Sequence, residues 1–244
     1  MSGESSHDGV VNLGFARVDS ARRERCGRAE VVFGEGKTPL EIARIASTIH
    51  GREGHVLVTR VSPDQADDVQ VHLPAAIYHE RARCLTLGKP TPNSSSVVVG
   101  ILCAGTSDLP VAEEAAITLQ AFGRRVERIH DVGVAGIHRL LGEIDRVRAC
   151  GVLIVVAGME GALPSAVAGL VEIPVIAVPT SVGYGANFDK DDGNFNPVFS
   201  KYTFLKNFKD GILPNLSHNS LYSNKNSSLV IPENLGLNSP FTAP

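Results

Sequence analysis

The chain has 244 residues, of which 43% are hydrophobic and 20% are charged, and its formal net charge is −3 at pH 7. This length can form one large domain or two small ones with a sizeable core. The acidic balance, the absence of tryptophan and the 5% of aromatic residues argue against nucleic-acid binding. The sequence predicts neither a membrane span nor a signal peptide, so we expect a cytoplasmic protein.

The first predicted helix covers Thr38–His50, where a threonine N-cap, a proline at the first helical position and Glu41 form a capping box. The glycine at position 51 is expected to end this helix. Residues 89–96 contain two prolines and a serine cluster and indicate a linker. We predict a small α+β domain over residues 1–90. Its other expected elements are a strand at His55–Val61, a helix after a second capping signature at Ser62–Gln65, and short strands at Pro74–Tyr78 and Cys84–Leu87.

Strands and helices alternate regularly beyond the linker. The strands are predicted at Val97–Cys103, Val126–Asp131, Gly151–Ala157 and Pro174–Val178, and the helices at Asp108–Phe122, Ile137–Cys150 and Leu163–Val171. This order predicts an α/β fold with a doubly wound parallel sheet over residues 97–188. In such sheets, ligands bind beyond the carboxyl ends of the strands.

The composition changes near residue 188. Residues 1–188 hold all 16 arginines, whereas residues 189–244 hold no arginine, five of the seven lysines and nine of the twelve asparagines. Proline, asparagine and serine interrupt each short apolar run in this last segment, so we expect a mostly irregular or disordered tail. A read-through or mis-spliced end and a lineage-specific tail both agree with this change.

Two loops at predicted strand ends carry candidate binding residues. Gly105–Asp108 combines small residues, two hydroxyls and a carboxylate before a helix. The loop suits a phosphate, and Asp108 suits a ribose hydroxyl or a metal, although a simple N-cap turn would look the same. Gly158–Leu163 brackets Glu160 with two glycines, which agrees equally with a tight turn and with a carboxylate that reaches a cleft. His138 and Arg139 begin a helix and could move a proton and hold an anion, although most single histidines in a sequence are structural or surface residues.

The four cysteines form no C-x-x-C pair, and the eight histidines show neither H-x-x-x-H nor H-E-x-x-H spacing. The sequence therefore predicts reduced thiols and no dedicated metal site. It also lacks a G-x-S-x-G elbow, which argues against a serine hydrolase of that type.

Long, non-repetitive segments carry a family resemblance: LGFARVDSARRER, VVFGEGKT, YHERARCLTLG, AGTSDLPVAEEAA, RVERIHDVGVAGIHRL, VAGMEGALPSAVAGLV and PVIAVPTSVGYGANF. They cover roughly residues 12–188 and resemble the LarB-type nickel-pincer cofactor biosynthesis proteins. The C-terminal half of that family is similar to the PurE-type aminoimidazole ribonucleotide (AIR) carboxylase/mutase, with a PurE-like, flavodoxin-like sheet. The N-terminal half separates this family from ordinary PurE.

The resemblance implies an activity. The family carboxylates the pyridinium ring of nicotinic acid adenine dinucleotide and cleaves its phosphoanhydride, which yields pyridinium-3,5-biscarboxylic acid mononucleotide and AMP. CO2 or bicarbonate would be the co-substrate, no tightly bound cofactor is implied, and a role for Mg2+ stays open. PurE-like assemblies are octamers, so we expect a homo-oligomer, weakened here by the altered C-terminus.

The same resemblance implies site residues. The nucleotide and substrate loops would comprise Gly105, Thr106, Ser107, Gly158, Met159, Glu160, Gly161, Ala162 and Leu163, and the catalytic residues would be His138, Arg139 and Asp108.

One part of the family pattern is missing. In the family, a cysteine from a segment resembling NSCAPGI adds to the electron-poor ring, and a segment resembling NIDNGFGAG ends the domain; neither follows Phe188 here. We therefore expect an incomplete sheet with an unpaired edge and a chain that lacks its nucleophile. Cys103 is the nearest substitute by topology, but we expect it to be a buried structural thiol.

Two other functions remain open from the sequence. One is a PurE-like AIR carboxylase/mutase of de novo purine (IMP) biosynthesis, which the extra N-terminal half disfavours. The other is a non-catalytic nucleotide-binding remnant, which the missing thiol favours.

Overall fold

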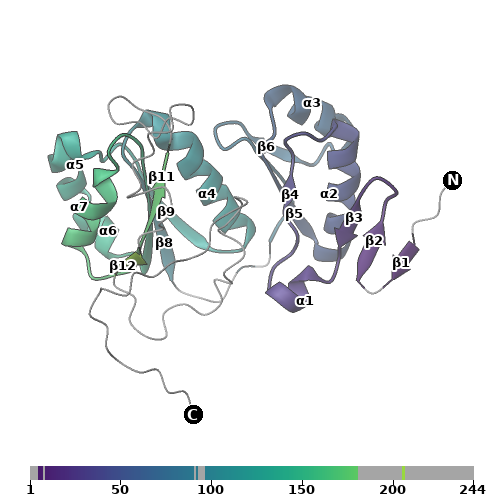
Figure 1. Cartoon of the computed structure of the whole chain (residues 1–244), viewed down its shortest axis with the longest axis horizontal. Coiled ribbons are helices and arrows are strands. Elements are labelled where there is room, and N and C mark those ends of the chain that lie inside the picture. Colours follow the sequence, from purple (N-terminus) through teal and green to yellow (C-terminus); the bar gives the residue numbers. More distant parts are fainter. Residues whose placement is uncertain (1–4, 8, 91, 93–96, 181–204, 207–244) are drawn as a thin grey trace, which may run out of the picture.

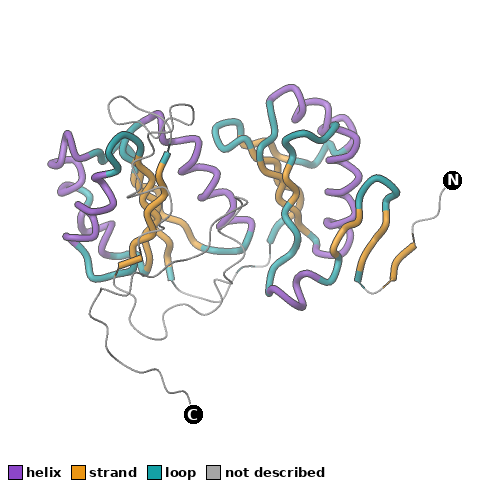
Figure 2. The backbone as a smooth tube through the Cα atoms, viewed as in Figure 1, coloured by secondary structure: helices purple, strands orange, loops and turns teal. Residues whose placement is uncertain are grey.

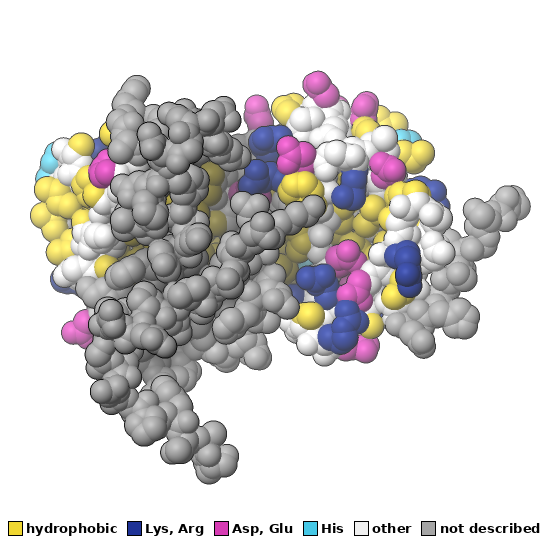
Figure 3. Space-filling view, viewed as in Figure 1, with side chains coloured by type: hydrophobic (Ala, Val, Ile, Leu, Met, Phe, Trp, Pro, Cys, Tyr) yellow, Lys and Arg dark blue, Asp and Glu magenta, His cyan; other side chains and the backbone are white. Residues whose placement is uncertain are grey.

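The computed structural model of the chain describes residues 5–7, 9–90, 92, 97–180 and 205–206. It contains two α/β halves, each with its own sheet and helices (Figures 1 and 2). On the face shown in Figure 3, acidic and basic side chains of the N-terminal half are interspersed. No helix in the described ranges is both long and apolar enough to cross a membrane.

The N-terminal half is built on a four-stranded sheet of order β4-β5-β7-β6. Its strands are β4 (Val32–Phe33), β5 (His55–Thr59), β6 (Ile77–His79) and β7 (Cys84–Gly88). Helices α2 (Pro39–Glu53) and α3 (Pro63–His72) pack on one face, where Val56 and Val58 of β5 are buried with Ile42 of α2. A separate antiparallel sheet and a short helix precede them: β1 (Ser5–His7), β2 (Val10–Asn12), β3 (Arg17–Asp19) and α1 (Arg22–Cys26).

Both predicted capping boxes are confirmed, because Thr38 and Ser62 each accept a hydrogen bond from the backbone N–H three residues later. The predicted end of the first helix is wrong. The helix α2 passes through position 51 and ends at Gly54, which adopts φ +71° and closes the last turn. A glycine inside a helix costs about 1 kcal/mol relative to alanine, and tertiary context can override such a cost, so the presence of Gly51 alone did not mark the end.

The second half confirms the predicted α/β fold with four parallel strands in the order β11-β10-β8-β9. These strands are β8 (Val98–Cys103), β9 (Arg125–Ile129), β10 (Val152–Ala157) and β11 (Val175–Pro179). Alternate residues face opposite layers. Ile101 packs with α4 (Leu109–Ala121), and Leu102 packs with the helices of the other face, which are α5 (Ile137–Gly142), α6 (Ile144–Arg148) and α7 (Ala162–Leu170).

Two expectations for this half need correction. The single helix predicted over Ile137–Cys150 is divided into α5 and α6 at Glu143, whose N–H bonds to Leu140 in a tighter turn. The edge of β11 is also not entirely unpaired, because β12 (Leu205–Lys206) joins it antiparallel opposite Val175 and Ile176. The rest of the predicted tail at 189–244 lies outside the described residues.

Helix α4 contacts both halves (Figure 1). One side covers the parallel sheet, and the other packs Ile117 and Ala121 against Leu57, Ala82 and Cys84 of the N-terminal half. The two halves are therefore joined by a shared apolar layer.

Candidate functional site

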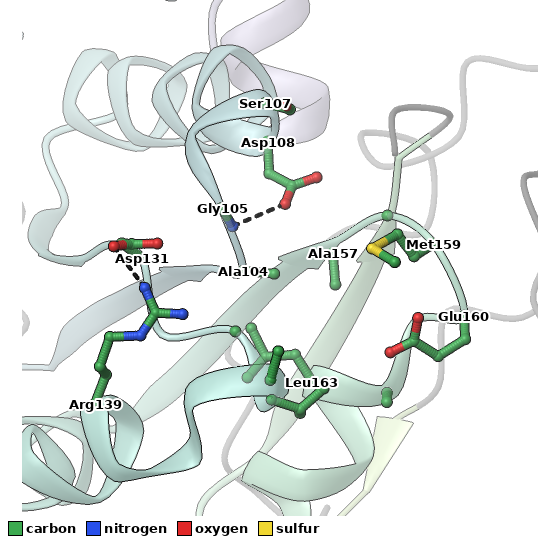
Figure 4. Close-up of a pocket in the computed structure, with 15 residues that line it drawn as sticks. Ala104, Gly105, Ser107, Asp108, Asp131, Arg139, Ala157, Met159, Glu160 and Leu163 are labelled. Atoms are coloured by element: carbon green, nitrogen blue, oxygen red, sulfur yellow. Dashed lines mark hydrogen bonds and ion pairs between the residues drawn. The ribbon is translucent and has the colours of Figure 1, made fainter. Parts of the chain in front are cut away.

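A cavity of about 310 Å³ lies at the carboxyl ends of the parallel strands, between the loops that follow β8, β9 and β10 (Figure 4). Most of the predicted site residues line it: Gly105, Ser107, Asp108, Arg139, Gly158, Met159, Glu160, Ala162 and Leu163. His138, Thr106 and Gly161 are not among the lining residues. The remaining lining residues are Ala104, Asp131, Gly133, Val134, Ala135 and Ala157.

The loop after β8 places Asp108 in a buried position, with 5% of its surface exposed. Its Oδ2 accepts a hydrogen bond from the backbone N–H of Gly105 at 3.0 Å, and its Oδ1 accepts one from the hydroxyl of Thr180 at 2.6 Å. Thr180 follows β11 and is itself buried. Both carboxylate oxygens are therefore already bonded, which makes Asp108 a fixed acceptor in the cavity wall rather than a freely moving acid.

The loop after β10 is a tight turn with unusual backbone angles. Met159 has φ +52° and Gly161 has φ +65°, and the N–H of Gly161 donates to the carbonyl of Gly158 at 2.9 Å. Glycine adopts the left-handed backbone region without the steric penalty that a Cβ atom imposes, which explains why a glycine stands at position 161. The turn carries Glu160 to the side of the cavity opposite Arg139 (Figure 4).

The loop after β9 supplies an ion pair that lines the cavity. Arg139 Nη1 lies 2.6 Å from Asp131 Oδ2, and both side chains are partly exposed. The loop is held against the end of β8, because the N–H of Gly133 donates to the carbonyl of Ala104 at 2.9 Å. Asp131 was not among the predicted site residues, because the sequence pattern placed it at the end of a strand, whereas β9 ends at Ile129. A polar residue at the predicted end of a buried strand was the available signal.

His138 does not share the position of its neighbour. Successive residues of an α-helix are rotated by about 100°, so the side chains of His138 and Arg139 at the start of α5 leave the helix in different directions. His138 is exposed and lies outside the lining, and its catalytic role stays a prediction.

None of the four cysteines lines the cavity. Cys84, Cys103 and Cys150 are buried, and Cys26 is exposed on α1 of the other half. Burial raises the pKa of the Cys84 thiol to about 12, and it also raises the pKa of Cys103 and of Cys150. A thiol must ionise and be accessible to act as a nucleophile, so the geometry agrees with Cys103 as a structural thiol.

The described part of the chain contains no group of three or more histidine, cysteine, aspartate or glutamate side chains placed to hold a metal ion. The carboxylates that line the cavity already have partners or are separated, since Asp131 pairs with Arg139 and Asp108 with Thr180.

Comparison with known proteins identifies both halves. Residues 10–89 match the family model of the LarB/PurE-like N-terminal domain, and residues 98–190 match that of AIR carboxylase. The chain is 40% identical over 177 residues to uncharacterized protein MJ0165 of Methanocaldococcus jannaschii, which covers 69% of each chain. It is also 40% identical over 85 residues to the N5-carboxyaminoimidazole ribonucleotide mutase of the same organism, across 34% of this chain and 52% of that one.

The order of the two matched domains agrees with the two halves of the structure, and the predicted resemblance is confirmed. The similarity to the mutase extends over about half of that enzyme, whereas the similarity to the first relative extends over more than two thirds of each chain. The chain therefore belongs to the LarB-type family, whose second half has the PurE-like fold of the carboxylase/mutase enzymes.

Proposed function

We propose that the cavity is the nucleotide site of a LarB-type carboxylase, and that its substrate is nicotinic acid adenine dinucleotide with CO2 or bicarbonate. The observation that carries this proposal is the convergence of three strand-end loops on one cavity in a chain whose two halves both match this family. The family reaction would release AMP and a pyridinium-3,5-biscarboxylic acid mononucleotide.

The lining supplies groups that suit such a ligand. Arg139 can donate to a phosphate or carboxylate, and Ser107 adds a hydroxyl beside the backbone N–H groups of its loop. Asp108 keeps lone pairs for a ribose hydroxyl after its two internal hydrogen bonds. Met159 and Leu163 offer apolar contact to a ring.

The carboxylation step needs a nucleophile that this chain does not place in the cavity. A pyridinium ring is electron-poor and must gain electron density before its carbon can attack CO2. In the family a cysteine adds to the ring, whereas here three thiols are buried and the sequence has no cysteine after Cys150. The unmodified chain is therefore expected to bind the dinucleotide without carboxylating it.

An assay with 13C-bicarbonate tests this proposal. The purified chain and a version with a family-like C-terminal segment would be incubated with nicotinic acid adenine dinucleotide and Mg2+, and mass spectrometry would follow AMP and the labelled mononucleotide. We expect turnover only in the restored version. Turnover by the unmodified chain would show that another thiol acts as the nucleophile. No turnover with either protein would refute the proposed reaction.

The mutase relative favours a second candidate, the PurE-type AIR carboxylase/mutase of purine biosynthesis. The two candidates differ in the ring that they bind. Competition between the dinucleotide and aminoimidazole ribonucleotide for the cavity, measured by calorimetry, separates them. A chain that binds AMP but converts neither substrate in any version would be the non-catalytic nucleotide-binding remnant.

The expected homo-oligomer is also part of this proposal. Light scattering after size exclusion measures it directly, and a monomer would show that the octameric assembly of PurE-like proteins does not extend to this chain.

A further inference from the structure

The ion pair in the cavity joins a strained residue to an exposed arginine. Asp131 has φ +59°, a left-handed conformation that is uncommon for residues other than glycine but tolerated by aspartate. Its carboxylate points toward the guanidinium of Arg139 across the loop (Figure 4), with Nη1 and Oδ2 2.6 Å apart. Side-chain exposure is 40% for Arg139 and 60% for Asp131, so the pair is open to a ligand.

A second contact restricts the same guanidinium. A Cβ added at Gly136 would lie 2.7 Å from Arg139 Nε, so the arginine packs directly over the glycine backbone. The guanidinium is thus bounded by the Asp131 carboxylate and by the backbone at Gly136. An arginine held in this way loses less conformational freedom when it binds an oxyanion.

Arg139 is the main candidate for binding a phosphate in this site. Among the described residues that line the cavity, it is the only one with a cationic side chain, whereas Asp108, Asp131 and Glu160 carry carboxylates. The position of one guanidinium therefore decides where a phosphate can bind. The ion pair engages Nη1, and the other N–H groups of the fork can donate to a second oxyanion.

We propose that Asp131 is a positioning residue that orients Arg139 toward an oxyanion of the ligand, here the phosphate of the nucleotide. This inference rests on the proposed function, because that function supplies the nucleotide. Asp131 acts through geometry, and its negative charge alone would oppose binding of a phosphate.

Two substitutions of Asp131 separate geometry from charge. Asp131→Asn removes the charge but keeps an oxygen that can accept from Arg139. Asp131→Gly removes the acceptor and suits the left-handed backbone, so it should not strain the loop. Because exposed ion pairs contribute little to stability, both variants are expected to fold, which thermal unfolding would verify.

Calorimetric titration with AMP gives the first readout. We expect Asp131→Gly to weaken AMP binding about tenfold, the order of one lost charge-assisted hydrogen bond, and Asp131→Asn to bind at least as tightly as the unmodified chain. In an Arg139→Ala background, Asp131→Gly should cause no further loss. Equal gains in affinity for the Asn and Gly variants would mean that Asp131 only repels anions, and unchanged affinity in both would mean that it has no role.

The second readout does not depend on a ligand. 15N relaxation of the Arg139 Nε–H group, assigned with Arg139→Lys, should show an ordered side chain in the free protein and a more mobile one in Asp131→Gly. Unchanged order would overturn the positioning role by itself. Absence of AMP binding by the unmodified chain, with the expected relaxation change, would instead overturn the proposed function.

Discussion

At the scale of single residues, the hydrogen bond between Thr180 and Asp108 connects the ends of two strands that are not neighbours, because β10 lies between β8 and β11. Both residues have 5% of their surface exposed. A buried carboxylate that loses a donor must remain partly unsatisfied, which costs more than an average hydrogen bond contributes. This contact therefore fixes one wall of the cavity before any ligand binds.

We expect Thr180→Val to lower the free energy of unfolding by about 1–3 kcal/mol, since it keeps the side-chain shape and removes the donor to Asp108. Thr180→Ser is the matched control, because it keeps the hydroxyl and loses one methyl group, worth about 1 kcal/mol. Urea denaturation measures both. A valine variant within about 0.5 kcal/mol of the unmodified chain would show that the bond is unimportant for stability.

Thiol accessibility provides a second prediction at this scale. Cys26 is exposed, whereas Cys84, Cys103 and Cys150 are buried with raised pKa values. We expect a thiol reagent at pH 7 to label Cys26 rapidly and the other three only after unfolding. Peptide mass spectrometry over time identifies the labelled residues. Rapid labelling of Cys103 in the folded chain would reopen its role as a nucleophile.

At the scale of elements, the sequence predicted those helices and strands whose positions depend on interactions between residues close together in the chain. The capping boxes at Thr38 and Ser62 fixed two helix starts, and continuous apolar runs identified β8 and β10, which are buried on both faces. The short strands β1 to β4 carry no comparable pattern. They depend on pairing with distant segments, as when Val32 of β4 pairs with Val58 of β5.

In the candidate site, too, features set by local sequence could be predicted, whereas contacts between side chains of different elements could not. The loops after β8 and β10 could be identified because glycines and hydroxyls cluster at predicted strand ends. The role of Asp131 depends on Arg139, which lies 8 residues later in the helix after the same loop. The role of Thr180 depends on Asp108, which lies 72 residues earlier at the end of another strand. No spacing rule relates such pairs. His138 lies outside the cavity lining although it precedes Arg139, because adjacency in the sequence does not fix the direction of a side chain.

The capping box of α2 permits a test of an element. Thr38 Oγ1 accepts from the N–H of Glu41 at 3.3 Å, and Glu41 Oε2 accepts from the N–H of Thr38 at 2.8 Å. We expect Thr38→Ala to destabilise the chain by about 1 kcal/mol in urea denaturation. Thr48→Ala in the same helix is the control, because the Thr48 hydroxyl only donates back to the carbonyl of Arg44 and should matter less. Equal effects of the two would mean that helix propensity, not capping, decides.

At the scale of the whole molecule, α4 links the N-terminal half to the cavity. Its first turn follows Ser107 and Asp108, while Ile117 and Ala121 further along are buried against the N-terminal sheet. Arg60 adds an ion pair to Glu114 across the same interface at 3.0 Å. A helix that is fixed along its length holds its N-terminal loop in place, so the N-terminal half contributes to the order of the site without lining it.

The interface between the halves also contains a histidine that should respond to pH. His79 of β6 bonds to Thr86 at 2.9 Å. Burial lowers the pKa of His79, Arg128 of β9 lowers it further, and Glu113 of α4, which accepts two hydrogen bonds from Arg128, opposes this shift. Protonation of His79 in the folded chain would therefore place an unfavourable charge in this interface.

The direction of the pH effect follows from proton linkage. Because the folded-state pKa of His79 lies below its unfolded value of about 6.5, the unfolded chain binds more protons between the two values. The free energy of unfolding should then fall as the pH decreases below about 6.5, and His79→Gln, which can still form a hydrogen bond with Thr86, should lose less stability between pH 8 and pH 5. His138→Gln, at an exposed site, is the control and should follow the unmodified chain. Parallel pH profiles for all three proteins would show that His79 is not protonated on unfolding and that other groups cause the acid sensitivity.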